Sequence, residues 1–208
     1  MPRFGYVAQS RLLDRTTNRT CRLGNATPQR LRELVALNLD ALAAILEFNV
    51  TQGWALFRIG SGVVPFASHP DVQFDWLAAS DDRLAAIGRY ARAHGLRLSM
   101  HPGQYTILNS PDAEVRASAV AELAYSAQFL DALGLDRQHK IVLHVGGIYG
   151  DKPAARARFA TYANALPESI RARLVVEHDD RRYTLADALA IHAETGLPVV
   201  YDNLHHDL

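Results

Sequence analysis

The fold is decided by the stretch Ser99-Met100-His101-Pro102-Gly103-Gln104-Tyr105, which ends a short apolar run and begins a rigid turn. His101 offers a metal-ligand side chain at the point where the apolar run stops. Pro102-Gly103 fixes a tight turn, so Gln104 and Tyr105 are expected to project from it. The same design, an apolar run that stops at a histidine or an acidic residue, recurs later in the chain. The chain is therefore expected to repeat one unit of strand and functional turn.

Six β-prone apolar runs follow one another at near-regular spacing. Several consist almost entirely of Val, Ile and Leu, which favours strands buried on both faces, as in a parallel sheet. The runs cover residues 4–7, 55–59, 96–100, 141–145, 174–177 and 198–202.

Helical patterns separate these runs. Thr27-Pro28 predicts an N-cap followed by proline at the first helical position. Leucines continue from it at helical spacing, at positions 31, 34, 37, 39, 42 and 46. Further helices are expected from Ser80 to about His94, from Ser110-Pro111 to Gly134, over residues 151–166, and from Thr184 to Gly196. The glycines after these segments predict helix C-termini.

Alternating strands and helices predict an α/β fold in a single domain. An open doubly wound sheet can close with six strands, whereas a TIM barrel needs eight and typically about 250 residues. No Gly-x-Gly-x-x-Gly or Walker sequence follows a strand, and polar residues sit at the ends of many strands, which favours the barrel. We expect a TIM (β/α)8-type barrel with about six of its eight βα units, forming one incomplete domain over residues 1–208.

Composition places the chain among ordinary globular proteins, with 49% hydrophobic residues, 21% charged residues and no net charge. The single cysteine, Cys21, excludes an internal disulfide and suits a cytoplasmic protein. No apolar run approaches the ~20 residues of a membrane span, so no membrane partner is expected. Residues 1–32 carry seven arginines against one acid, Asp14. This segment could follow a phosphate backbone, or it could be a solvated loop.

Ligand-type residues occur at or just after the ends of five of the six expected strands. They are His69 after the second strand, His101, His144 and Glu177 at the next three, and Asp202 with His205 and His206 after the last. In a parallel barrel all these ends lie on one face. A lone histidine there is more often a hydrogen-bonded core residue, but the recurrence favours a site for Zn²⁺ or Mn²⁺. Paired metals in such a site activate a water and stabilise a phosphodiester under attack.

Two loop features accompany these ligands. Gln104 and Tyr105 could probe a base edge and stack on a base, or Tyr105 could simply pack over its loop. Gly146-Gly147 after His144 lets the backbone turn closely beside the site, or forms an ordinary βα turn.

The chain resembles the UV damage endonuclease family (UvsE/UVDE) over essentially its whole length. The motifs that carry the resemblance are Gly5-Tyr6, Arg58 with Ser61 and Pro65, Ser99 to Tyr105, Leu143 to Gly147 with Tyr149 to Lys152, Glu177 to Asp180, and Asp202 to His206.

The resemblance implies a TIM barrel that nicks damaged double-stranded DNA immediately 5′ to ultraviolet photoproducts. It implies a cluster of divalent metals, with Mn²⁺ preferred over Zn²⁺, Mg²⁺ or Co²⁺. The ligands that it implies are His69, His101, His144, Glu177, Asp202 and His205. Glu177, His101 and His144 would be catalytic; Gln104 and Tyr105 would probe the DNA, and Tyr6 would line the lesion pocket. A monomer associated with the nucleoid is expected.

Departures from the family pattern are His178, where asparagine is usual, and Gln9-Ser10, where a polar amide is common. The remaining family ligands and a metal-associated lysine would lie beyond residue 208, so the chain is expected to be truncated. Three alternatives stay open: an abasic-site endonuclease, a sugar isomerase on a related metal barrel, and a non-cleaving fragment that binds damaged DNA.

Overall fold

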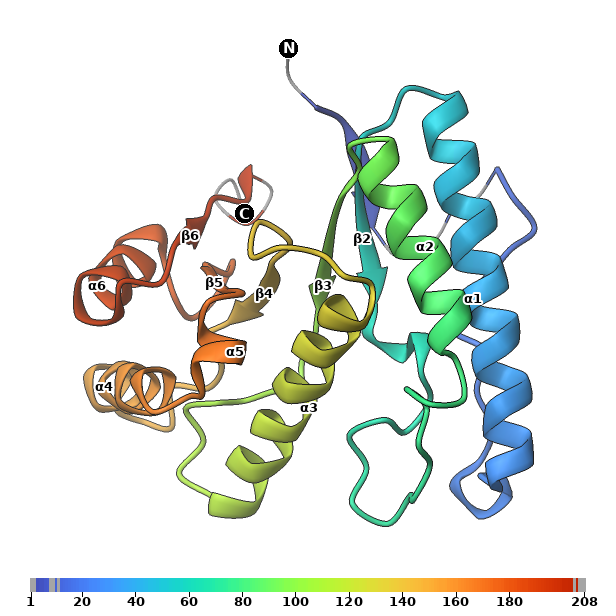
Figure 1. The fold of residues 1–208 in the computed structure, drawn as a ribbon. Coiled ribbons are helices and arrows are strands. Elements are labelled where there is room, and N and C mark those ends of the chain that lie inside the picture. Colours follow the sequence, from blue (N-terminus) through green and yellow to red (C-terminus); the bar gives the residue numbers. More distant parts are fainter. Residues whose placement is uncertain (1–2, 8–9, 11, 204, 206–208) are drawn as a thin grey trace. The chain divides into compact units, whose positions relative to one another are not determined.

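The computed structural model describes residues 3–7, 10, 12–203 and 205, and it confirms the alternation of strands and helices. The chain divides into two compact units, residues 1–101 with 128–139 and residues 102–127 with 140–208. The first unit contains β1 (Gly5–Val7), α1 (Pro28–Thr51), β2 (Leu56–Gly60), α2 (Asp81–Ala93) and β3 (Arg97–His101), with short 3-10 helices η1 (Leu23–Asn25) and η2 (Ser61–Val63). The second contains β4 (Ile141–His144), α4 (Lys152–Asn164), α5 (Glu168–Arg171), β5 (Leu174–Glu177), α6 (Leu185–Thr195) and β6 (Val199–Val200). Helix α3 (Ala113–Ala132) begins in the second unit and ends in the first (Figure 1).

The strands of the first unit are parallel neighbours in chain order. Tyr6 of β1 lies opposite Phe57 of β2, and Gly60 of β2 lies opposite His101 of β3. Helix α1 connects β1 to β2 and helix α2 connects β2 to β3, as parallel pairing requires. The βα repeat expected from the apolar runs is therefore present in this unit.

Helix α1 begins as its sequence predicts, but its buried face differs from the expected row of leucines. Thr27 accepts a hydrogen bond from the Arg30 backbone N–H at 3.2 Å, and Pro28 follows it at the first helical position. Leu37 is 48% exposed, whereas Asn38 is fully buried. The buried stripe passes through Leu31, Leu34 and Asn38 at intervals of three and four residues, and Leu37 lies one position away from it.

Length and composition alone would let α1 cross a membrane, with a mean hydropathy of 1.5 over its most apolar window. Half of that window is buried inside the protein. The buried leucines and isoleucine of this helix belong to the core of the first unit, which accounts for its apolar character.

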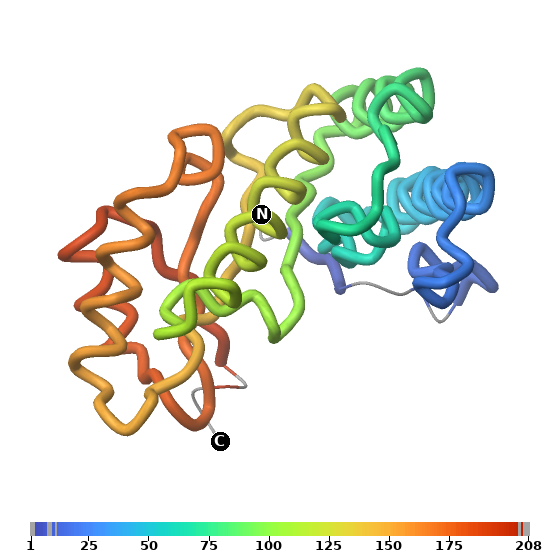
Figure 2. The backbone as a smooth tube through the Cα atoms, turned by 90° about the horizontal axis from the view of Figure 1, so that it is seen from below, coloured from blue at the N-terminus to red at the C-terminus, as the bar shows by residue number. Residues whose placement is uncertain are grey.

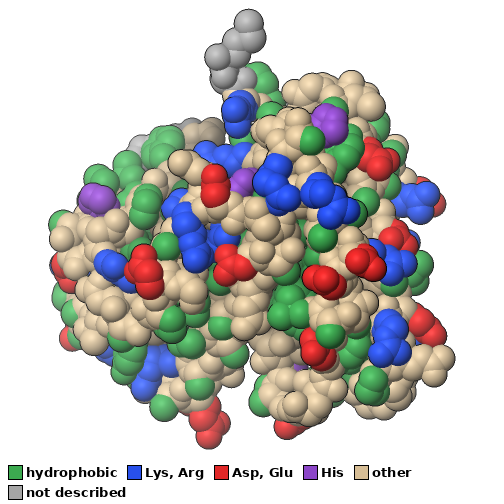
Figure 3. All heavy atoms as spheres, viewed as in Figure 1, with side chains coloured by type: hydrophobic (Ala, Val, Ile, Leu, Met, Phe, Trp, Pro, Cys, Tyr) green, Lys and Arg blue, Asp and Glu red, His purple; other side chains and the backbone are tan. Residues whose placement is uncertain are grey.

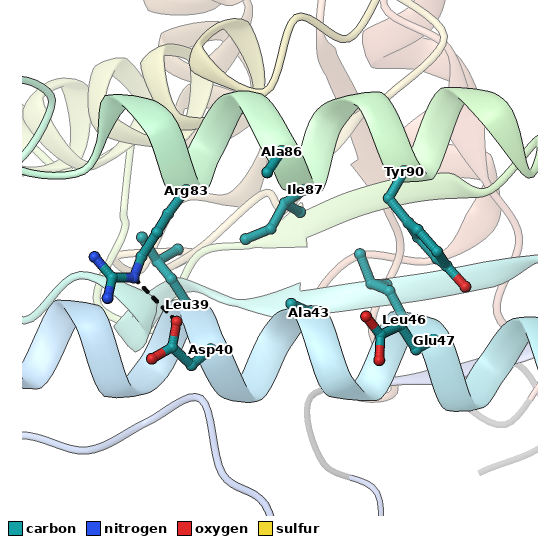
Figure 4. A pocket seen from close by; sticks show the side chains of 9 residues that line it. All are labelled: Leu39, Asp40, Ala43, Leu46, Glu47, Arg83, Ala86, Ile87 and Tyr90. Atoms are coloured by element: carbon teal, nitrogen blue, oxygen red, sulfur yellow. Dashed lines mark hydrogen bonds and ion pairs between the residues drawn. The ribbon is translucent and has the colours of Figure 1, made fainter.

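Helices α1 and α2 pack side by side and leave a groove of about 310 Å³ between them (Figure 4). Ala43 of α1 and Ala86 of α2 line the groove, and their short side chains leave space between the two helices. An ion pair between Arg83 and Asp40, 3.0 Å long, closes one end. Both of its partners are about half exposed, so the pair contributes little to stability.

The second unit is built in the same way. Strands β4, β5 and β6 are parallel neighbours, with His144 opposite Glu177 and Glu177 opposite Val200. Helices α4 and α6 lie side by side in both backbone views (Figures 1 and 2). The predicted helix starts at residue 151 and Thr184 are confirmed, and both residues cap their helices. Asp151 accepts from the Ala154 N–H at 3.0 Å, and Thr184 forms a capping box with Asp187.

The predicted start of the helix at Ser80 is confirmed, and the predicted start at Ser110-Pro111 is wrong. Ser80 precedes α2 but makes no side-chain capping bond, so the first-turn acids Asp81 and Asp82 offer the favourable charge there. Helix α3 begins at Ala113 rather than at Ser110-Pro111, because the Asp112 carboxylate accepts from the Glu114 and Val115 N–H groups. The four-residue α5 was not predicted; it is too short to show a helical period.

On the face drawn in Figure 3, basic and acidic side chains are interspersed rather than gathered by sign. This mixture agrees with the absence of net charge on the chain. Any preference for a polyanion must therefore come from local groups of side chains and not from the field of the whole molecule.

Candidate metal centre

The centre of the candidate site is a histidine and a glutamate at the ends of two neighbouring strands. His144 ends β4 and Glu177 ends β5, and the two residues are register partners. Register partners on neighbouring parallel strands point to the same side of the sheet. The His144 Nε2 atom consequently lies 3.3 Å from Glu177 Oε2. The Glu177 side chain is only 2% exposed, whereas that of His144 is 33% exposed.

A second pair of ligand-type residues follows β6. Asp202 lies two residues beyond the strand, and the Asp202 carboxylate accepts from the His205 backbone N–H at 3.3 Å. Glu177, Asp202 and His205 each place one ligand atom within 4.8 Å of the others. The ring of His205 also lies 5.3 Å from that of His144, centroid to centroid. Four of the six predicted ligands therefore gather in the second unit.

His178 supports this group from behind. It is 1% exposed, and its Nε2 atom accepts a hydrogen bond from the Asp202 backbone N–H at 3.1 Å. Its carbonyl oxygen lies 3.1 Å from His205 Nδ1. A carbonyl can only accept, so His205 Nδ1 carries the proton and donates it. That tautomer leaves the Nε2 atom of His205 available as a ligand, the usual arrangement for histidines that bind metals.

The donor set fits a divalent cation. It combines imidazole nitrogens with carboxylate oxygens and includes no sulfur, which suits Zn²⁺ or Mn²⁺. Two carboxylates held within a few ångströms repel each other, and burying one of them is unfavourable without a positive charge nearby. A bound cation would offset both costs.

The loop that follows His144 is fixed from below by two buried side chains. Asn109, fully buried, donates from Nδ2 to the Gly147 carbonyl at 2.8 Å. The hydroxyl of Tyr183, also fully buried, donates to the same carbonyl at 2.9 Å. Burial raises the pKa of the Tyr183 phenol, so it remains a donor. Gly146, with φ of 109°, leaves no room for a side chain because a Cβ would lie 2.6 Å from Asn109 Oδ1.

The start of α4 is tied to α6 beside this loop. Lys152 Nζ lies 2.6 Å from Asp187 Oδ2 and over the Tyr183 ring. Burial would raise the pKa of the Asp187 carboxyl, but hydrogen bonds from Lys152 and Thr184 outweigh it and hold that pKa below its ordinary value. The Gly-Gly turn after His144 is thus part of a fixed framework, which favours its interpretation as support for the site.

Three predicted site residues lie in the first unit. His101 ends β3, and His69 follows η2 in a turn where its Nδ1 atom accepts from the Asp71 N–H at 3.2 Å. Tyr6 donates its hydroxyl hydrogen to Asn49 Oδ1 at 2.8 Å and packs edge-on against Trp54 and Phe57. The metal roles of the two histidines and the DNA role of Tyr6 stay predictions.

The predicted probe residues Gln104 and Tyr105 are exposed on the turn after β3. The Gly103 carbonyl accepts from the Thr106 N–H at 2.9 Å, which closes the turn. Tyr105 is 81% exposed and therefore does not pack over its own loop. Leu204, His206 and Gln9 from the expected motifs lie outside the described residues.

Sequence reasoning missed His178 and Asn109 as supports of the site. Asn109 lies beyond the motif that ends at Tyr105 and is not a ligand type, whereas His178 directly follows Glu177, to which the ligand role was given. Three histidines outside the candidate site have structural contacts. His94 stacks on Tyr90, His139 accepts from the Leu98 N–H, and His192 bonds to the Leu197 carbonyl.

Comparison with known proteins gives consistent relatives. A UV DNA damage endonuclease of Clostridium perfringens is 37% identical over 204 residues, which cover 98% of this chain and 50% of that protein. Another from Bacillus velezensis is 35% identical over 212 residues, covering 98% and 66%. The chain thus spans about half to two thirds of the length of these relatives. The crystal structure of SacUVDE matches with a TM-score of 0.95 at 38% identity, covering 99% of this chain and 70% of that one.

More distant structures agree on the fold alone. A D-psicose 3-epimerase matches at 20% identity with a TM-score of 0.59, over 80% of this chain and 59% of its own. Endonuclease IV from Thermus thermophilus matches at 21% identity with a TM-score of 0.55, over 79% and 59%. The expected fold class, an α/β fold of TIM-barrel type with six βα strands in this chain, is confirmed. The model of the family UV-endonuclease UvdE matches residues 2–208, and the chain belongs to that family.

Proposed function

We propose that the protein is a DNA repair endonuclease that nicks the backbone immediately 5′ to ultraviolet photoproducts by metal-assisted hydrolysis. Cyclobutane dimers and 6-4 photoproducts are the main lesions, with some others accepted. The observation that carries the proposal is the Glu177 carboxylate, 2% exposed and 3.3 Å from His144, in a chain of the UV-endonuclease family. The chain spans about half to two thirds of the length of the relatives on which this proposal draws.

The proposed metal centre consists of ligand residues and of residues that hold those ligands in place. His144, Glu177, Asp202 and His205 hold a divalent metal group, with Mn²⁺ preferred, and the resemblance assigns His69 and His101 the same role. When bound, such a metal would supply an activated water and stabilise charge on the scissile phosphate. Glu177 presents a buried carboxylate at the site, while His178 fixes the Asp202 backbone and the His205 ring.

Recognition of damaged double-stranded DNA is assigned to the exposed turn after β3. Gln104 and the 81% exposed Tyr105 can enter the duplex without disturbing the core of their unit. Turning out a damaged base step costs a few kcal/mol and less than turning out an intact one, which favours lesions. The proposed state is a monomer of the cytoplasm, associated with the nucleoid.

The first test compares incision of irradiated, abasic and intact duplexes by metal-stripped protein resupplied with Mn²⁺. We expect a nick 5′ to the photoproduct that depends on metal. Glu177→Ala should abolish incision and lower metal content with little loss of DNA binding. The matched control is Glu194→Ala, which removes a half-exposed glutamate from α6. Full incision by Glu177→Ala would remove this residue from the metal site.

The substrate panel also separates the alternatives. Cleavage confined to abasic duplexes would indicate an abasic-site endonuclease, and conversion of a sugar without any nicking would indicate an isomerase. Binding to irradiated DNA without incision would indicate a damage-binding protein. Changing Gln104 and Tyr105 together to Ala should lower the preference for irradiated over intact DNA while metal content stays constant. Unchanged preference would refute their role as the probe.

A further inference from the structure

The loop between β4 and α4 contains one residue whose conformation the fold does not explain. After the glycine pair, the chain continues Ile148-Tyr149-Gly150-Asp151-Lys152. Gly150 takes the left-handed φ of 77° that glycine permits, Asp151 caps α4, and Lys152 pairs with Asp187. Tyr149 does none of these things. It is 45% exposed and adopts a φ of 50°.

A positive φ at an aromatic residue is strained. Left-handed conformations are unfavourable for a side chain with a Cβ, and such strain gathers at functional sites. Among described non-glycine residues only Phe66 and Tyr149 show it. The Tyr149 ring is half-exposed and does not lie in a core, so core packing does not offset the strain.

The position of the Tyr149 ring is set by its neighbours. The ring lies over Gly147, where a Cβ would come within 2.7 Å of Tyr149 Cε2. The guanidinium of Arg158 lies 5.6 Å from the ring centroid. Gly147 is thus required for the ring to lie where it does, and Arg158 places a positive charge over the ring.

The base of this arrangement is rigid. The Gly147 carbonyl takes hydrogen bonds from both Asn109 and Tyr183. Arg158 in turn donates from Nε to the Asn109 carbonyl at 3.2 Å. The side chain beside the ring and the backbone below it therefore share one buried anchor, Asn109. A ring held in this way is preorganised and loses little entropy when a ligand stacks on it.

We propose that Tyr149, with Arg158 beside it, is a stacking platform for one unstacked base of the bound DNA strand. The inference rests on the proposed function and adds a substrate-contacting residue to it. The loop begins directly after His144, so the platform and a metal-ligand residue are joined by four residues of fixed loop. A half-exposed aromatic ring next to an arginine suits a nucleobase on a charged backbone. The neighbouring Ile148, 40% exposed, extends the apolar contact.

The test measures binding rather than cleavage. Fluorescence anisotropy would give the dissociation constant for a labelled single-stranded oligonucleotide and for an irradiated duplex, both with metal bound. A 2-aminopurine in each probe reports stacking by quenching. Tyr149→Asn removes the ring but keeps a residue that tolerates a positive φ, so the loop should retain its conformation. Tyr149→Phe keeps the ring, and Tyr162→Ala removes a tyrosine of α4 whose ring lies under another arginine, Arg116 of α3.

We expect Tyr149→Asn to weaken binding to both probes about tenfold and to abolish the added quenching. Tyr149→Phe and Tyr162→Ala should remain within about twofold of the starting protein, and metal content should not change. Equal binding by Tyr149→Asn, or equal losses for Asn and Phe, would overturn the platform. Wild-type protein that binds and quenches but never incises irradiated DNA would refute the proposed function alone. Wild-type protein that binds neither probe would refute the platform as well.

Discussion

Replacing His178 should weaken metal binding even though His178 is not a ligand. The side chain is 1% exposed, and its Nε2 atom is the acceptor for the Asp202 backbone N–H. His178→Ala leaves that N–H without its partner and opens space beside the Tyr201 ring, whose centroid lies 5.5 Å away. Asp202 can then adopt more than one position, and the free energy needed to order it lowers the metal affinity.

The size of the effect follows from the bonds that are lost and kept. A neutral hydrogen bond contributes about 0.5–1.5 kcal/mol, and a buried N–H left unsatisfied costs about 1–3 kcal/mol. The bond from His205 Nδ1 goes to the His178 carbonyl, which every substitution retains. Only one of the two supports is removed, so we expect roughly 1.4–2.8 kcal/mol, or about 10- to 100-fold weaker metal binding.

The assay titrates metal-stripped protein with Mn²⁺ and measures binding by calorimetry or from the electron paramagnetic resonance signal of free Mn²⁺. His178→Gln supplies an amide oxygen near the former Nε2 position and should restore most of the affinity. His192→Ala removes a histidine that bonds to the Leu197 carbonyl in α6 and should leave the affinity unchanged. The support role is refuted if His178→Ala binds Mn²⁺ as tightly as the starting protein, or if His178→Gln binds Mn²⁺ more weakly than His178→Ala.

Two further predictions concern the framework. Asn38→Ala deprives the Arg19 N–H, the Arg19 carbonyl and the Val63 carbonyl of partners at 2.9, 3.0 and 3.1 Å. It should lower stability by about 3 kcal/mol and the melting temperature by roughly 6–12 °C, with Asn38→Asp worse because its carboxylate faces two carbonyls. Leu37→Ala, at the exposed neighbouring position, should change the melting temperature little. Equal melting temperatures for all three variants would refute a stabilising role for the Asn38 hydrogen bonds. Because the pKa of Asp187 is lowered in the folded protein, its stabilisation is present above the ordinary 3.8 and is lost as pH falls through the lowered value. Lys152→Met should therefore lower the free energy of unfolding at neutral pH, and its difference from the unsubstituted protein should shrink as pH falls toward about pH 3; equal stability at neutral pH, or a difference that does not shrink, would contradict this.

The helices and strands were predictable because their signals are local. Thr27-Pro28, Asp151 and Thr184 mark helix starts through bonds to their own first turns, and glycines after the helices permit positive φ. The α1 face was less predictable. Leu37 is as apolar as its neighbours, yet the buried position belongs to Asn38, because two distant backbone segments require its amide there.

Within the site, strand ends were informative where register decides the geometry. His144 and Glu177 are adjacent because they end neighbouring parallel strands. Once both strand ends are recognised in the sequence, the pairing of these two residues can be predicted. Asp202 and His205 needed more than that rule. They lie beyond β6 on a turn whose path depends on His178, and no pattern in the sequence gives the direction of that turn.

The supports of the site share a property that explains why sequence patterns pass over them. Asn109, Tyr183 and His178 each bond to a backbone group of a loop that carries or follows a ligand, and each is buried. A bond to backbone does not depend on the identity of the residue that it holds, so no pairing of residue types marks it in the sequence. What marks it is the need of every buried N–H and C=O for a partner. That need also limits substitution: position 178 requires an acceptor that reaches Asp202, and position 109 requires a donor that reaches Gly147. A search for such acceptors and donors behind ligand-bearing loops would therefore find supports that a search for ligands cannot.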